Sequence, residues 1–123
     1  MRKAEFLTPL TVRMLPESSD QLWQLTEPLR YYSRVMRREI EVPVDFVTNF
    51  VSFAPLKYCG IRAAVVHDFL YSCSDVKRIT ADRVLLEALH AVGVNEIRAH
   101  EMYVAVRACG GAFRNDTPYT LGG

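Results

Sequence analysis

The sequence predicts an α+β fold, with about four antiparallel strands in the N-terminal part followed by a unit of three helices. The spacing of hydrophobic residues changes once, after Pro55, from every second residue to about every three and a half. The 123 residues, 50% of them hydrophobic, fit a single domain with a substantial core. We therefore expect one domain, 1–123, made of extended N-terminal strands (1–38), a core (39–110) and an exposed tail (111–123).

Alternation of apolar and polar residues places the strands. Residues 10–14, 22–25 and 29–35 are extended candidates, with a turn over 16–20. The clearest strand covers 39–47, where Ile40, Val42, Val44 and Phe46 share one face. Because Pro43 donates no hydrogen bond to a neighbouring strand, this segment is expected at the edge of a sheet.

Helical spacing predicts helices over 60–72, 80–92 and 95–110. Asn95 is a good N-cap for the third helix, which ends at Gly110 and Gly111. In the second helix, Arg83, Glu87 and His90 project onto the solvent face. Asp82 instead projects toward the core from the first turn, where the helix dipole favours a carboxylate.

The overall charge does not indicate a binding partner. Fifteen basic and fourteen acidic residues give a net charge of +1, which provides no global attraction to nucleic acid or to an anionic membrane. A local basic run, Arg30, Arg34, Arg37 and Arg38, is interleaved with Tyr31 and Tyr32 in a pattern that can follow a phosphate backbone. A solvated strand or turn explains the run as well, so nucleic acid is not expected as a partner.

The cysteine count and the N-terminal residues suggest the cellular compartment of the protein. Cys59, Cys73 and Cys109 match no zinc or disulfide pattern and are interpreted as reduced, core-filling thiols. No secretory signal follows Met1, and no run of about 18 apolar residues is present to span a bilayer. We expect the protein to remain in the cytoplasm of the cell that makes it.

One polar centre interrupts the first helix. His67 and Asp68 lie in an apolar segment, and a buried imidazole or carboxylate requires partners. Adjacent helical residues diverge by about 100°, so Asp82 is better placed than Asp68 to orient His67. Thr48 and Asn49 follow the end of strand 39–47, and Tyr71 lies one turn after His67. We expect these three side chains to form a hydrogen-bond network with His67, Asp68 and Asp82.

Several separated motifs, in order, resemble the DUF1353 family of small phage and prophage proteins of unknown function. They are VPVDFVTNFVS at 42–52, AAVVHDFLY at 63–71, ADRVLLEA at 81–88 and MYVAVRACG at 102–110. The resemblance covers about the last two thirds of the chain and leaves 1–38 outside it. It implies a phage context, with synthesis in the host cytoplasm, rather than an activity.

The strand-end motif departs from the family pattern, which has aspartate and alanine where this chain has Asn49 and Val51. Three carboxylates and a histidine in relatives would suit a divalent metal or a general base. A neutral amide removes one charge and one strong ligand, which weakens a catalytic interpretation. Asn49 can still hold a hydrogen-bond network together.

Each candidate residue also has a structural interpretation. His67, Asp68 and Asp82 fit a buried, mutually satisfied network better than a reacting centre. The string His67-Asp68-x-x-Tyr71 resembles the active helix of secreted phospholipases A2, but the chain lacks their glycine-rich calcium loop and paired cysteines. Ser52 is a candidate nucleophile, although no Gly-x-Ser-x-Gly motif surrounds it, so a turn serine is favoured.

Two main hypotheses follow. The first is a phage structural or assembly protein of the tail, baseplate or capsid, incorporated into the virion. It would dock to other phage proteins or to copies of itself through Trp23, Tyr31, Tyr32, Arg34 and a free C-terminal tail. The second is a hydrolase of the host envelope, acting on peptidoglycan or lipid, with a divalent metal as its cofactor if it needs one. Its catalytic residues would be His67, Asp68, Asp82 and Ser52.

Overall fold

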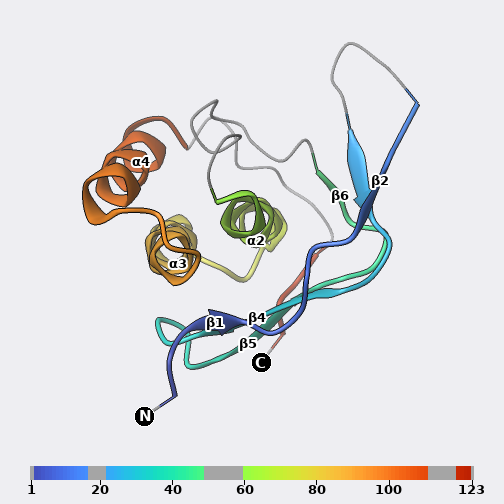
Figure 1. Ribbon diagram of the computed structural model, residues 1–123, viewed down its shortest axis with the longest axis horizontal. Coiled ribbons are helices and arrows are strands. Elements are labelled where there is room, and N and C mark those ends of the chain that lie inside the picture. The colour runs from blue at the N-terminus through green and yellow to red at the C-terminus, as the bar shows by residue number, and fades with distance from the viewer. Residues whose placement is uncertain (1, 17–21, 49–59, 111–118, 123) are drawn as a thin grey trace.

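Two small antiparallel sheets and three helices make up the fold (Figure 1). The computed structural model of the protein describes residues 2–16, 22–48, 60–110 and 119–122. Helices follow strands along the chain, and all paired strands run antiparallel. The α+β prediction is therefore confirmed, with six short strands in the described residues where about four were expected.

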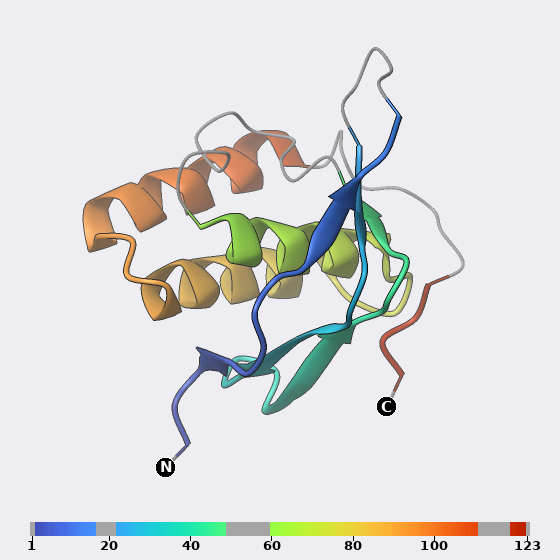
Figure 2. The same cartoon turned by 45° about the vertical axis from the view of Figure 1, so that its right-hand side comes forward.

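The two sheets share the N-terminal half of the chain. The first has the order β1-β4-β5, and its strands are β1 (Glu5–Phe6), β4 (Leu29–Ser33) and β5 (Arg38–Val42). The second has the order β2-β3-β6, and its strands are β2 (Val12–Met14), β3 (Trp23–Leu25) and β6 (Val47–Thr48). The first sheet lies along the helices, while β2 and β3 extend away from it (Figure 2).

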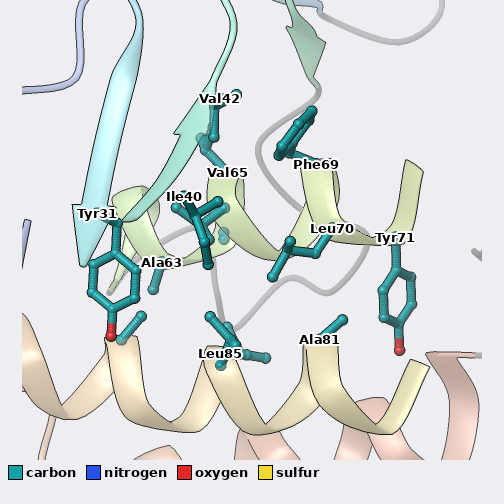
Figure 3. Close-up of a cluster of buried hydrophobic side chains, with 14 of the residues drawn as sticks. Tyr31, Ile40, Val42, Ala63, Val65, Phe69, Leu70, Tyr71, Ala81 and Leu85 are labelled. Carbon is teal, nitrogen blue, oxygen red and sulfur yellow. The ribbon is translucent and has the colours of Figure 1, made fainter. Parts of the chain in front are cut away.

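Helix α2 (Ile61–Ser72) is the central element, between the first sheet and α3 (Arg78–Ala91). Nearly all of its residues from Ala63 to Ser72 are buried, which explains its apolar composition. Tyr31, Ile40 and Val42 from the sheet and Leu85 from α3 pack on its two sides (Figure 3). Helix α4 (Glu96–Cys109) packs on α3. No helix in the described ranges is long and apolar enough to cross a bilayer.

The strand expected over 39–47 is divided, so that prediction was wrong in extent. β5 ends at Val42, and the chain turns through Pro43, Val44 and Asp45 before β6 joins the other sheet. Pro43 has no N–H to continue the ladder, and Asp45 adopts a left-handed φ of 73°. Val44 is consequently 47% exposed rather than buried. The expectation of an edge position is confirmed, since β5 is the last strand of its sheet.

Glu87 is the largest departure from the predicted solvent face of α3. Its Oε1 accepts hydrogen bonds from the Tyr31 hydroxyl at 2.8 Å and the Ser33 hydroxyl at 2.9 Å. Its Oε2 accepts the backbone N–H groups of Arg34 and Val35, both at 3.0 Å. Helical projection did not predict this role because the β4–β5 turn reaches over that side of the helix. Arg83 and His90 are exposed as expected.

The described part of the C-terminal tail is extended but is not free. The Asp75 carboxylate accepts the backbone N–H groups of Leu121 and Gly122 at 2.9 and 3.0 Å, and Arg38 donates to the Gly122 carbonyl at 2.6 Å. These backbone hydrogen bonds also hold the pKa of Asp75 below its ordinary value. The tail therefore fastens the α2–α3 loop to the end of the first sheet.

The cysteine predictions have mixed outcomes. Cys73 is a buried free thiol, as expected, whereas Cys109 is a free thiol exposed at the end of α4. Cys59 lies outside the described residues. The core-filling interpretation was therefore wrong for Cys109.

Glu87 gives the first testable prediction. Glu87→Ala removes four acceptor contacts at once and leaves the Tyr31 hydroxyl without its partner, so we expect a loss of about 3 kcal/mol in the free energy of unfolding. Urea denaturation measures it. Glu101→Ala, at an exposed position of α4, is the matched control. Equal effects of the two substitutions would show that Glu87 does not fasten the turn.

Candidate functional site

Three helices bring their polar side chains to one buried point. His67 and Tyr71 are four residues apart and therefore share a face of α2. Asp82 lies in the first part of α3 with a fully buried side chain. Figure 3 shows Tyr71 reaching from α2 toward α3, with its hydroxyl at the far end. Arg107, near the end of α4, completes the contact from the third helix.

Asp82 is the common partner of these side chains. Its Oδ1 lies 2.8 Å from His67 Nε2 and accepts a hydrogen bond from the Tyr71 hydroxyl at 2.6 Å. Its Oδ2 accepts from Arg107 Nη1 at 2.8 Å, with Arg78 Nη1 at 3.9 Å. We call these five residues the Asp82 cluster. The predicted pairing of His67 with Asp82 is confirmed as a contact.

The Asp82 carboxylate is held in its ionised form. Burial alone would raise its pKa, but hydrogen bonds from His67, Tyr71 and Arg107 outweigh burial and lower the pKa below its ordinary value. Burial and the hydrogen bond to Asp82 raise the pKa of Tyr71, which keeps its hydroxyl a donor. An ionised acid surrounded by donors is the arrangement in which a buried charge is tolerated.

His67 has one nitrogen committed and one available. The ionised Asp82 can only accept, so the uncharged imidazole carries its hydrogen on Nε2 and its lone pair on Nδ1. Nδ1 has no hydrogen-bond partner in the described part of the chain. The His67 side chain is 8% exposed, so only a small part of it reaches solvent. A histidine oriented by a carboxylate with its other nitrogen free has the arrangement of a general base.

Asp68 points to a different neighbour. Its Oδ2 accepts the Thr48 hydroxyl at 2.7 Å, which ties α2 to the end of β6. Burial raises the pKa of Asp68, and the Thr48 hydrogen bond opposes that rise. The six-residue network expected from the sequence is thus two contacts on neighbouring faces of α2, His67–Tyr71–Asp82 and Thr48–Asp68. Asn49 and Ser52 lie outside the described residues.

The donor set at Asp82 does not fit a metal ion. Both oxygens already accept from protein groups, and a cation would have to displace the Arg107 guanidinium. Within the described ranges no group of three or more histidine, cysteine, aspartate or glutamate residues is placed to hold a metal. We therefore derive no chemistry from a metal at this cluster.

The four residues predicted for docking are separated by the fold. Tyr31 is fully buried and bonded to Glu87, so the prediction of an exposed docking role for it was wrong. Its place in the alternating strand β4 turns it inward, and the same alternation turns Tyr32 outward, under the Arg2 guanidinium at 4.0 Å. Arg34 is exposed in the β4–β5 turn, and Trp23 is half-buried in β3.

Two arginines of the site and the role of one glycine were not predicted from the sequence. Arg78 and Arg107 belong to the Asp82 cluster, and Arg78 also donates to the Val106 carbonyl at 3.0 Å. The signal available was the four-residue spacing of Arg78 and Asp82. Gly110, noted only as a helix end, is required because a Cβ there would collide with the Tyr71 hydroxyl.

A family model described as "Protein of unknown function (DUF1353)" matches residues 23–106. The chain belongs to the DUF1353 family. No curated protein and no solved structure matches it. In this DUF1353 protein the matched region contains four of the five members of the Asp82 cluster, and Arg107 lies one residue beyond it. The matched region begins at residue 23 and so includes the β3 and β4 strands, which the quoted motifs had left outside the resemblance.

Acid stability tests the state of Asp82. An aspartate in the unfolded chain titrates near a pKa of about 3.9, and the cluster holds the folded value lower. As pH falls the unfolded state binds the proton first, so the stabilisation from Asp82 is complete above about pH 5 and is lost as pH falls through the folded pKa.

Asp82→Asn is therefore expected to lower the free energy of unfolding by about 3 kcal/mol at neutral pH and to flatten its decline between about pH 5 and pH 2. Urea denaturation across that range compares the variant with wild type. Because Asp75 also titrates in acid, the difference between the two curves is the relevant quantity. Parallel curves would mean that Asp82 is not held ionised by its neighbours.

Proposed function

We propose that this DUF1353 protein is a phage-encoded hydrolase of the host envelope in which His67 is the general base and Asp82 the orienting carboxylate. The observation that carries the proposal is the 2.8 Å contact from Nε2 to Asp82, which leaves Nδ1 with its lone pair and without a hydrogen-bond partner among the described residues. A wholly structural histidine has no need of an unpaired nitrogen.

The reaction that suits this arrangement is attack by water on an ester. Nδ1 takes a proton from water, the water oxygen adds to the carbonyl carbon, and the proton passes to the alcohol as the ester C–O bond breaks. Tyr71 donates to the same Asp82 oxygen and so keeps the carboxylate in place while the imidazole becomes charged. Arg107 supports the other oxygen.

The neighbouring strands favour a lipid substrate over peptidoglycan. Met14 pairs with Trp23, and Trp23 pairs with Thr48, so the three side chains form a row on one face of the second sheet. Thr48 is bonded to Asp68, the residue after His67, and Met14 at the other end of the row is 56% exposed. The row leads away from Asp68, and its members Trp23 and Met14 supply an apolar surface that suits an acyl chain. The likeness of His67-Asp68-x-x-Tyr71 to the active helix of secreted phospholipases A2 supports the same class.

The substitution His67→Gln distinguishes a loss of catalysis from a loss of stability. The glutamine amide nitrogen can still donate to Asp82, but the variant has no basic nitrogen in place of Nδ1. We expect hydrolysis of phospholipid vesicles to fall at least about 100-fold while the melting temperature changes little. His100→Asn, at an exposed position of α4, is the matched control.

The assay uses phospholipid vesicles and purified peptidoglycan, each with and without added calcium or zinc, because a metal held elsewhere in the chain would change the rate. Equal activity of wild type and His67→Gln, or no activity of either on both substrates, would refute the hydrolase. Activity on peptidoglycan alone, lost in His67→Gln, would keep the general base and reject the lipid substrate.

A second candidate function, a structural or assembly protein of the virion, is favoured by the second sheet. Its two edge strands expose Met14 and Val47, which are 56% and 41% exposed. Short edge strands with exposed apolar side chains can pair with another protein or a second copy. The three donors on Asp82 also suit a purely structural role for the cluster.

Virion incorporation has its own test. If the protein is a virion component, mass spectrometry of particles purified from infected cells detects it, and His67→Gln, which keeps the fold, is incorporated as wild type is. A double variant, Met14→Ser with Val47→Ser, is expected to reduce incorporation because it removes the exposed apolar groups of both edges. Particles without the wild-type protein would reject this candidate.

A further inference from the structure

A cavity lies away from the Asp82 cluster, between the N-terminal segment, the β4–β5 turn and the outer face of α3. Its volume is about 940 Å³, at the upper end of the range for small-molecule sites. Four arginines line it, Arg2, Arg34, Arg37 and Arg83, together with the apolar side chain of Leu86 and the ring of Tyr32. We call it the arginine cavity.

Two of the four arginines that line this cavity, Arg37 and Arg83, have no acidic partner among the described residues. Glu87 is the only acid among its described lining residues, and both of its oxygens are bonded to Tyr31, Ser33 and the backbone of the turn. Arg2 has an acidic neighbour, Glu39, at 3.6 Å. In the described part of the chain neither Arg37 nor Arg83 forms an ion pair. Guanidinium groups without acidic partners on the wall of one cavity favour an anionic ligand.

The turn that carries Arg34 and Arg37 is held in a fixed position. Glu87 accepts the backbone N–H of Arg34, which fixes the start of the turn against α3. Arg37 adopts a left-handed φ of 55°, a conformation that glycine or asparagine adopts with less strain. Arg37 also lines the cavity, which motivates the hypothesis that its side chain has a role there.

We propose that the arginine cavity binds a phosphate-bearing ligand that also has an apolar or aromatic part. The planar guanidinium group pairs with two phosphate oxygens at once, and several of them together match a dianion. Leu86 and Tyr32 provide the surface for the remainder of the ligand. This site does not include His67, so it stands or fails independently of the hydrolase.

The source of the phosphate is either a free phosphate ester or a phospholipid headgroup, and one set of titrations distinguishes them. Phenyl phosphate is the free ester, benzoate has the same ring with a carboxylate, and phosphatidylglycerol vesicles are compared with phosphatidylcholine vesicles. Isothermal calorimetry with the full chain at low salt is expected to give a dissociation constant below about 1 mM for phenyl phosphate or for phosphatidylglycerol.

Arg37→Gly and Arg83→Gln are each expected to weaken that binding about tenfold, and Arg98→Gln, an exposed arginine of α4, is the charge-matched control. Arg37→Gly also relieves the left-handed strain, so its melting temperature should equal or exceed that of wild type. His67→Gln should bind the ligand as wild type does.

Binding of phenyl phosphate supports the proposal with a free ester as the source, and binding of phosphatidylglycerol vesicles alone supports it with a headgroup as the source. Four results would overturn it. They are no dissociation constant below about 1 mM for either probe, equal binding of benzoate and phenyl phosphate, binding of a single-stranded oligonucleotide, added as a further probe, without binding of either phosphate probe, and loss of affinity in Arg98→Gln equal to that in the two cavity variants.

Discussion

The contact on which the helical unit depends is the buried carboxylate of Asp82. It accepts from His67 and Tyr71 of α2 and from Arg107 of α4, so one side chain of α3 joins all three helices. A buried charge stabilises a fold only when its surroundings compensate the loss of water, and here two oxygens meet three close donors. Removing any donor leaves part of that charge without compensation. The cluster therefore fixes the orientation of His67 more strictly than packing alone would.

Glu87, less than two turns further along α3, has the same role toward the sheet that Asp82 has toward the helices. It bonds to two hydroxyls and two backbone groups of the β4–β5 hairpin. These two carboxylates bond α3 to the hairpin and to the other two helices. Asp82 orients His67 inside the helical unit, whereas Glu87 positions the arginine-bearing turn outside it. The two candidate sites are therefore separate.

The sequence predicted the fold class, the three helices and the inward direction of Asp82, because these depend on local periodicity and on the position of a residue within its own helix. It did not predict Arg107 or the four contacts of Glu87. Arg107 is 25 residues from Asp82 in sequence, and Glu87 meets a turn more than 50 residues away. A helical projection cannot show which element covers a face. The break in the strand at Pro43 was predicted only in part. Proline indicated an edge position, but it did not indicate that the chain passes to the other sheet.

The Asp82 cluster also shows why stability and catalysis are hard to separate in this protein. The bond from Nε2 serves both roles, since it satisfies a buried charge and fixes the imidazole. Nδ1 serves only the catalytic role. No described residue bonds to it, and it does not stabilise the charge of Asp82. The difference between a structural centre and a reacting one is therefore confined to a single nitrogen atom. Substitutions that keep the donor and remove the base are the ones that distinguish the two roles, whereas truncation of His67 changes both together.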